Sequence, residues 1–226
     1  MISERQLANN YNSFWENIAP MLTSYILKIN KSELKRFSSP VTSAISSGDR
    51  GLINETAFIV CTLGEFNTDN YEKALSLAHD KIKKLEKGDL SKNISIHEVK
   101  DLFYSFRRFV KLFSIEDSGI EYYPKFKGCG FLNGCEGDLA MSDTLFESKC
   151  GDRNFKGADL KQVLAYAALR YFELGKTYSQ IGLVNARRGT CFFDDIDSIC
   201  FSISGLSAID LFEALRVFLE GQQVSK

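Results

Sequence analysis

The sequence predicts an α+β fold in which a helical N-terminal half, residues 1–95, precedes an α/β core, residues 96–226, whose small mixed sheet is flanked by helices. Up to about residue 115, apolar residues recur at the three- and four-residue spacing of amphipathic helices. Beyond it, glycines become frequent and short stretches alternate polar and apolar residues, as strands do. Strong helical patterns at 159–174 and after residue 207 are interleaved with these stretches, which indicates a sheet covered by helices.

Composition narrows the class of protein. The chain has 226 residues, 44% hydrophobic and 25% charged, which suffices for one large domain or two small ones. Its six cysteines form no C-x-x-C pair, so we expect neither a zinc site nor a disulfide framework. No signal peptide is recognisable and no apolar run reaches membrane-spanning length, so we expect a cytoplasmic protein with no membrane partner.

The N-terminal half reads as a series of helices. Residues 1–31 have helical spacing and predict one or two helices, with Ser3 as a cap. Residues 32–53 are rich in turn formers and predict a loop or a short helix. The apolar run 56–66 fits a buried helix or a strand, and we favour a helix because its neighbours are helical. Residues 67–87 show a clear amphipathic pattern that ends in a lysine-rich turn.

A further helix is predicted over residues 95–113. It opens with Ser95 and Glu98, the spacing of a capping box in which each side chain bonds the other residue's main chain. Its last turns are basic, which we interpret as a solvated helix end favoured by the helix dipole rather than as a phosphate site.

The core is predicted to consist of short elements separated by turns. In chain order these are a strand at 121–127, a hairpin at 134–149, a helix at 159–174, strands at 181–185 and 191–196, one further possible strand at 197–204, and a last helix from Ser207 onward. Arg187 and Arg188 lie in the turn between two of the strands, and we interpret them as solvated charges.

The hairpin carries the chemistry. Its turn is Ser142-Asp143, and strand alternation puts Glu147 and Lys149 on one face, with Asp138 brought across from them. Two carboxylates and a lysine on one face of a small sheet are costly core filling. A hard divalent cation held by the carboxylate oxygens would resolve this conflict.

The spacing of these three residues is not specific by itself. Asp89, Glu98 and Lys100 repeat it. There Glu98 is expected to complete the cap of Ser95, and positions two apart on a helix point to different sides. We therefore treat the earlier copy as coincidence.

The helix after the hairpin strengthens the later copy. Asp159, Gln162 and Tyr166 lie at i, i+3 and i+7, on one side of that helix and at the edge of its apolar stripe. An acid, then an acid-x-Lys, then Gln-x-x-x-Tyr on a helix resembles the PD-(D/E)XK nuclease superfamily, especially its branch of RecB and lambda-type exonuclease domains. The resemblance covers roughly residues 100–205, and Gly137 stands where the family motif has Pro.

The resemblance implies an αβββαβ core and hydrolysis of phosphodiester bonds with a metal cofactor. Asp138, Glu147 and the carbonyl of Ser148 would bind Mg²⁺, for which Mn²⁺ is expected to substitute. Lys149 would orient or deprotonate the attacking water and stabilise the developing negative charge.

Further residues take supporting roles under this resemblance. Gln162 would hold the lysine, a water or the phosphate, and Tyr166 would contact the nucleic-acid backbone or pack the helix. Arg153 and Lys156, in the loop after the hairpin, are the best candidates for phosphate contact, with an ordinary polar loop as the alternative. Glu136 could assist a second metal or be an exposed strand-edge residue.

The expected function is that of a nuclease, with DNA rather than RNA as the expected substrate. By family resemblance it would serve restriction, repair or anti-phage defence, with an ATPase or helicase as a protein partner, or as a homodimer. The net charge of −1 excludes binding of nucleic acid through overall charge alone. Two alternatives stay open: a catalytically silent binding subunit with the same fold, and a structural salt-bridge cluster in an unrelated domain.

Overall fold

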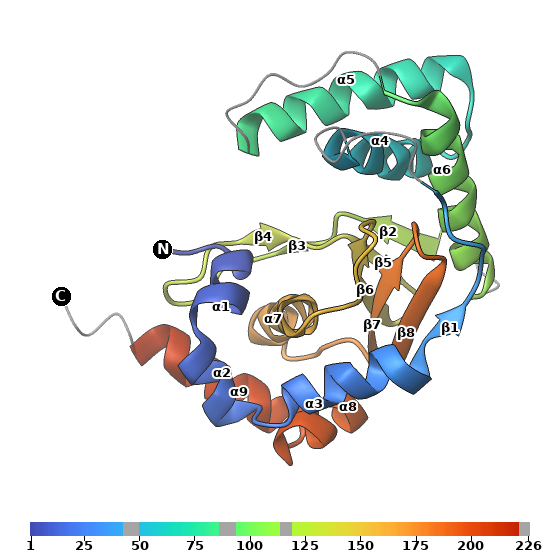
Figure 1. The fold of residues 1–226 in the computed structure, drawn as a ribbon. Helices are drawn as coiled ribbons and strands as arrows, with labels where there is room; N and C mark the ends of the chain where they lie inside the picture. The colour runs from blue at the N-terminus through green and yellow to red at the C-terminus, as the bar shows by residue number, and fades with distance from the viewer. Residues whose placement is uncertain (43–49, 86–93, 114–118, 222–226) are drawn as a thin grey trace.

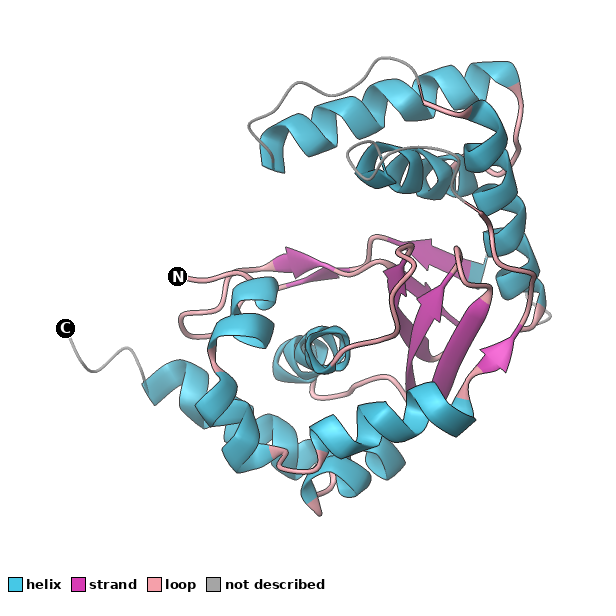
Figure 2. Cartoon of the chain, viewed as in Figure 1, coloured by secondary structure: helices cyan, strands magenta, loops and turns pink. Residues whose placement is uncertain are grey.

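The computed structural model describes residues 1–42, 50–85, 94–113 and 119–221. These residues form a mixed α+β fold in which a sheet has helices on both sides (Figure 1, Figure 2). The helices are α1 (Glu4–Asn10), α2 (Asn12–Ile18), α3 (Leu22–Lys28), the π-helix η1 (Ile29–Glu33), α4 (Arg50–Thr62), α5 (Thr68–Leu85), α6 (Ile96–Lys111), α7 (Gly157–Leu174), α8 (Ile196–Ser204) and α9 (Ala208–Gly221). The strands are β1 (Lys35–Arg36), β2 (Ile120–Tyr122), β3 (Lys125–Phe126), β4 (Cys135–Glu136), β5 (Leu139–Met141), β6 (Thr144–Lys149), β7 (Gln180–Asn185) and β8 (Thr190–Asp195).

Across the described ranges, six strands form one sheet in the order β1-β8-β7-β6-β5-β2. Strands β6 and β7 are parallel and are joined through α7, the kind of crossover that parallel neighbours need. All other neighbouring pairs are antiparallel. Strands β3 and β4 pair separately as a two-stranded ribbon that lies against α7.

Each face of the sheet has its own apolar cluster. On one face α7 is central, with α1, α2, α3, α8 and α9 around it (Figure 1). The other face is covered by α4, α5 and α6. The first cluster joins residues from both ends of the chain, for example Leu7 and Leu215. The proposed division into two regions after residue 95 stays a prediction.

Two of the predicted strands are broken at matched positions. The strand predicted at 121–127 divides at Tyr123-Pro124 into β2 and β3, and the first strand of the hairpin divides at Gly137-Asp138 into β4 and β5. Proline has no N–H for a ladder, and Tyr123 adopts a positive φ of 54°. The breaks are joined by hydrogen bonds from Tyr123 N to Asp138 O (3.0 Å) and from Gly137 N to Pro124 O (2.8 Å). Both strands therefore leave the sheet for the ribbon together.

The strand considered at 197–204 is wrong, because these residues form α8. Ile196, Ile199 and Ile203 are buried at helical spacing, whereas Phe201 is 68% exposed. The carboxylate of Asp195 accepts the N–H of Ser198 at 2.8 Å. This side-chain cap stabilises the start of the helix, and a strand would not form it.

The N-terminal part also differs in detail. Residues 1–31 contain three α-helices and enter η1, rather than forming one or two helices, and Ser3 caps α1 as predicted. Strand β1 lies within the predicted loop 32–53 and pairs with β8 at the sheet edge, while residues 43–49 lie outside the described ranges. Residues 56–62 of the run 56–66 belong to α4, so the favoured helix is confirmed there, whereas 63–65 form a turn and a bend. Helices α5, α6, α7 and α9 and strands β6, β7 and β8 are confirmed.

Among the described residues no single helix is long and apolar enough to cross a membrane, although the bent pair of α8 and α9 has the length and composition when taken together. The apolar side of each of these helices is packed in the cluster around α7.

Arg187, in the turn between β7 and β8, joins the α4–α6 layer to the sheet. Its side chain is 1% exposed, so the prediction of a solvated charge is wrong. Its Nε donates to the carbonyl of Cys150 at 2.7 Å, and its two terminal nitrogens donate to Glu98 Oε1 at 2.6 Å and Asn54 Oδ1 at 2.8 Å. These oxygens replace water around the guanidinium. Ser95 Oγ accepts the N–H of Glu98 at 3.3 Å, so the cap is present, but the Glu98 carboxylate bonds Arg187.

Replacing Arg187 with methionine should lower the free energy of unfolding by about 3–5 kcal/mol, because it leaves the Glu98 carboxylate buried without its cation. Urea unfolding followed by circular dichroism measures this loss. The double variant R187M/E98Q should regain part of it, since it no longer buries a lone charge. R188M, at the half-buried neighbouring arginine, is the matched control and should cost less than about 1 kcal/mol. Equal losses for R187M and R188M would contradict the assigned role.

Candidate active site

The hairpin of β5 and β6 brings Asp138 and Glu147 to one face of the sheet. The register pairs Leu139 with Phe146, so one step before β5 Asp138 is level with Glu147. Directly opposed residues of an antiparallel pair share a face. Asp138 Oδ2 accepts the main-chain N–H of Ser148 at 2.7 Å, which fixes the carboxylate against β6.

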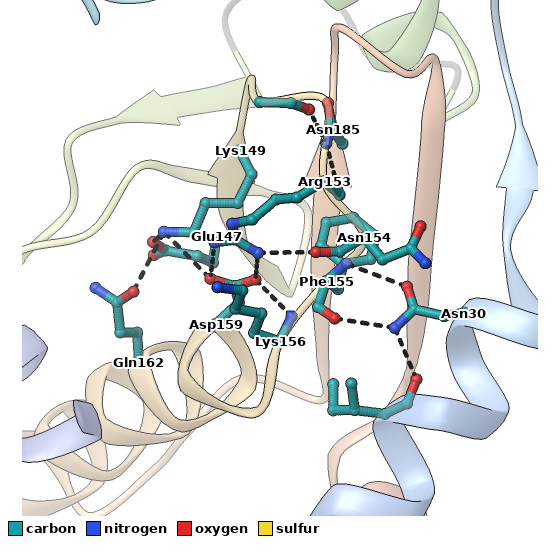
Figure 3. A network of polar contacts seen from close by, with 12 residues as sticks. Asn30, Glu147, Lys149, Arg153, Asn154, Phe155, Lys156, Asp159, Gln162 and Asn185 are labelled. Atoms are coloured by element: carbon teal, nitrogen blue, oxygen red, sulfur yellow. Dashed lines mark hydrogen bonds and ion pairs between the residues drawn. The ribbon is translucent and has the colours of Figure 1, made fainter. Parts of the chain in front are cut away.

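Lys149 lies two residues further along β6, on the same face as Glu147. Its Nζ donates to Glu147 Oε1 and, at 3.2 Å, to Gln162 Oε1, and it lies 3.7 Å from Asp159 Oδ1 (Figure 3). The Lys149 side chain is 20% exposed, against 3% for Glu147. The ammonium group is therefore held between β6 and α7, among side chains from both elements.

The first turn of α7 supplies Asp159. Its carboxylate accepts the N–H of Lys156 at 2.8 Å, which closes the start of the helix. It also receives two hydrogen bonds from the guanidinium of Arg153, at 2.7 and 2.8 Å. Arg153 keeps 40% of its side chain exposed and Lys156 is exposed, so both reach solvent beside the site. Their contact with phosphate stays a prediction.

One and two turns further on, α7 supplies Gln162 and Tyr166. Gln162 is buried and holds Lys149 through its Oε1. The ring of Tyr166 stacks on Phe126 of the ribbon, with ring centroids 5.4 Å apart. Burial, then the nearby Glu147 and Asp138 carboxylates, raises the pKa of the Tyr166 hydroxyl above its usual range. Of its two expected roles, this placement favours packing of the helix.

Glu136 does not join this cluster. It lies on β4 in the ribbon, is exposed, and its carboxylate is 3.8 Å from the Lys125 ammonium. The break at Gly137-Asp138 turns the chain between β4 and β5, so the first strand of the predicted hairpin is not continuous and Glu136 is separated from Asp138. The interpretation of Glu136 as an exposed strand-edge residue is confirmed.

The earlier copy of the motif forms no comparable site in the described part of the chain. Glu98 bonds the buried Arg187, whereas Lys100 lies over the ring of Phe66, 6.0 Å from its centroid. Asp89 lies outside the described residues. The two described members of the earlier copy therefore bond different partners.

Sequence reasoning missed a pocket beside Asp138. The pocket has a volume of about 200 Å³ and is lined by Asp138 and Lys149 from the hairpin, Glu55 from α4 and Arg5 from α1. The hydroxyl of Tyr123 donates to Glu55 Oε1 at 3.2 Å, which fixes this acid at the pocket wall. The signal available for Glu55 was an acid at the start of a strongly apolar helical run. Arg5 gave no signal, because its position depends on how α1 packs.

The titration behaviour of the cluster follows from burial and from its own charges. Burial, then the neighbouring Asp138, raises the pKa of Glu147 to about 8 against the opposing effect of Lys149. Burial also raises the pKa of Asp138, although Lys149 and the Ser148 N–H oppose it. Burial disfavours the charged form of Lys149, but Glu147, Asp138 and Asp159 outweigh it, so its pKa is raised. Lys149 therefore stays protonated at neutral pH in this arrangement.

The residues present can be compared with the needs of Mg²⁺. Within the described ranges there is no group of three or more His, Cys, Asp or Glu side chains that could hold a metal ion. The candidate donors are the carboxylates of Asp138 and Glu147 and the carbonyl of Ser148. Mg²⁺ commonly uses one or two protein carboxylates and completes its shell with water and phosphate oxygens. Glu147 Oε2 is buried without a hydrogen-bond partner in the described structure, and it could coordinate a cation instead. An all-oxygen set of this size fits Mg²⁺.

In the absence of metal, stability should fall as the pH rises towards 8. Folded Glu147 keeps its proton up to about pH 8, whereas an ordinary glutamate loses it near 4.5. The stability from this proton is complete below pH 4.5 and is lost as the pH rises to about 8. The free energy of unfolding, measured with urea across this pH range, should depend less on pH in E147Q than in the wild-type protein. The difference in slope should be up to about 1.4 kcal/mol per pH unit.

E136Q is the matched control for this measurement, because it removes an exposed carboxylate from the adjoining ribbon. Its pH profile should follow that of the wild-type protein. If E147Q showed the same pH dependence as wild type, the raised pKa of Glu147 would be refuted.

Neither protein-family models, nor curated proteins, nor solved structures match this chain. What the cluster does must therefore be argued from its own geometry: two acids, a protonated lysine and a glutamine, gathered by β6 and α7 at the edge of a pocket.

Proposed function

We propose that this protein is a metal-dependent nuclease that hydrolyses the phosphodiester bonds of nucleic acid, with DNA favoured over RNA as the substrate. One observation carries the proposal. The buried carboxylate of Glu147 is level with Asp138 across the hairpin and keeps Oε2 without a hydrogen-bond partner among the described residues. Buried polar atoms are nearly always paired, so this oxygen needs an explanation. A bound cation shared with Asp138 gives one.

The order of elements supports the same proposal. Read along the chain, α6, β2, β5, β6, α7 and β7 give a helix, three strands, a helix and a strand. This is the αβββαβ order that the resemblance to PD-(D/E)XK nucleases implies, with the ribbon of β3 and β4 inserted between the first and second strands. The acid-x-Lys segment lies on the third of these strands, and Gln162 and Tyr166 lie on the following helix.

Each residue of the cluster has a distinct task under this proposal. Bound by Asp138, Glu147 and the carbonyl of Ser148, Mg²⁺ would neutralise phosphate charge and lower the pKa of the attacking water. Lys149 is protonated and held by Gln162, so it stabilises developing negative charge and orients water; its raised pKa disfavours the alternative of a general base.

Gln162 also has a donor to offer the substrate. Its Oε1 accepts from Lys149, and its Nε2 is buried with no hydrogen-bond partner in the described parts of the chain. This amide can donate to a phosphate oxygen or to a water at the site. Of the two α7 residues, Gln162 therefore acts on both the lysine and the substrate, whereas Tyr166 packs the helix.

A structural ion cluster is the alternative that a specific contact favours. Lys149 Nζ contacts Glu147 and lies 3.7 Å from Asp159, which Arg153 also bonds, so the two cations and the Asp159 carboxylate partly compensate one another. A catalytically silent binding subunit would keep the same contacts. Roles in restriction, repair or anti-phage defence, an ATPase or helicase partner and a homodimer rest on the family resemblance alone.

The direct test is cleavage of DNA and RNA substrates with Mg²⁺ or with EDTA. D138N should lose activity because it removes a metal ligand, and K149M because it removes the fixed positive charge. Each should lower the cleavage rate by at least about a hundredfold at unchanged fold. Rates are measured from labelled strands on denaturing gels.

The matched control is again E136Q, which makes the same change of acid to amide two residues from Asp138 but outside the cluster. It should cut at the wild-type rate. Equal activity in wild type, D138N and K149M, or activity that survives EDTA, would remove the proposal.

Metal binding can be tested without turnover. Calorimetric titration of wild type with Mn²⁺ should give a heat that depends on the buffer, because Glu147, with a pKa of about 8, must release its proton when it binds the cation at neutral pH. D138N should weaken binding and E136Q should not. Absence of Mn²⁺ binding by folded wild-type protein would favour the silent subunit or the structural cluster.

A further inference from the structure

A second pocket lies on the side of the molecule where β1 meets the turn between β7 and β8. It has a volume of about 500 Å³, and we call it the β1–β8 groove. Its lining includes Arg36, Pro40, Val41, Asp152, Asn154 and Arg188. Arg36 is exposed and Arg188 is half-buried, so the groove presents two guanidinium groups next to a loop of the candidate active site.

The two arginines are held in place by the fold. The Arg36 guanidinium donates to the carbonyls of Arg188 at 3.1 Å and Ser38 at 3.4 Å. Gly189 has a φ of 63°, and a Cβ there would clash with Ser38, so the turn that carries Arg188 needs this glycine. The N–H of Phe37 donates to the Gly189 carbonyl at 2.9 Å. The turn and β1 are thus fastened together and position both side chains.

The acid in the lining does not cancel this charge. Asp152 forms an ion pair with Arg50 at the start of α4. The pair is close to neutral, which leaves the positive charges of Arg36 and Arg188 uncompensated by Asp152. A groove with two fixed guanidinium groups suits an anion with several oxygens, because guanidinium binds phosphate oxygens in a bidentate manner.

Side chains of one loop link the β1–β8 groove to the candidate active site. Arg188 donates to Asn154 Oδ1, and Arg153 donates to the carbonyl of the same residue at 2.8 Å. Arg153 in turn bonds Asp159, which lies 3.7 Å from Lys149 Nζ (Figure 3). The groove and the lysine are therefore separated by a short series of contacting side chains, on one continuous part of the structure.

We propose that the β1–β8 groove binds the phosphodiester backbone of the DNA substrate beside the bond that is cut, with Arg36 and Arg188 each contacting phosphate. The inference rests on the proposed nuclease function and adds to it the path of the strand. Contacts of this kind position a nucleic acid without reading its bases, so they supply affinity rather than sequence preference. They also explain how a chain with a net charge of −1 could grip DNA through local charge.

The test is binding of a fluorescein-labelled DNA duplex in EDTA, measured by anisotropy over a range of salt concentrations. R36Q/R188Q should bind about tenfold more weakly, with a slope of log K against log salt that is less steep by about 1.8, about 0.9 for each lost contact. R36Q alone, at an exposed side chain, should change the slope by about 0.9 if the double variant does not fold. R36K/R188K should keep the wild-type slope.

The matched control is K127Q/K176Q, which removes two positive charges near the C-terminal end of α7. Both lysines are exposed, and Lys127 forms an ion pair with Glu173 at 2.7 Å. This variant should keep the wild-type affinity and slope. If R36Q or R36Q/R188Q behaved like K127Q/K176Q, the proposed strand path would be overturned.

Cleavage of the same duplex with Mg²⁺ separates this inference from the proposed function. If R36Q/R188Q bound and cut the duplex as well as the wild-type protein does, the proposed role of the β1–β8 groove would be overturned and the proposed nuclease function would stand. Binding that depends on the two arginines without any cutting would support the groove as a DNA site and count against the nuclease. Absence of DNA binding by wild type, or binding of an RNA duplex alone, would overturn the inference.

Discussion

The burial of Arg187 is the constraint on which the arrangement of the two layers depends. A guanidinium this far from water is stable only while its partners stay in place, and these partners come from α4, α6 and the end of β6. Asn54, one of them, precedes Glu55 in the chain. The same interaction that fixes the helical layer on the sheet thus holds Glu55 at the wall of the pocket beside Asp138.

A second constraint is the pair of strand breaks at Pro124 and Gly137. A continuous first strand would have kept Glu136 and Asp138 on one face, giving the hairpin a third acid beside Lys149. Because both strands turn at the same level, Glu136 leaves with the ribbon and Asp138 stays with β6. The ribbon in turn places Phe126 on Tyr166 of α7. The breaks therefore decide which acids the site contains and how its helix is packed.

Much of this arrangement could be predicted from local sequence, because it depends on local periodicity. Alternation along 144–149 placed Glu147 and Lys149 together, and spacing along α7 placed Asp159 beside Gln162. What could not be predicted depends on contacts between distant segments. Arg187 looks like a turn charge until α6 brings a carboxylate to it. Glu55 and Arg5 line the pocket only because of how α4 and α1 pack, and residue spacing in the sequence does not predict this packing.

The positions of the basic residues also show why overall charge is a poor guide to function in this chain. Arg187 is enclosed by carboxylate, carbonyl and amide oxygens, so its charge is used inside the molecule. Arg36 and Arg188 are held instead by main-chain carbonyls and an amide, which fix a guanidinium without neutralising it. Such a group keeps its full attraction for phosphate while losing little conformational freedom on binding. The net charge of −1 therefore does not distinguish two kinds of cationic side chain: one that is buried and stabilises the fold, and one that can bind a ligand.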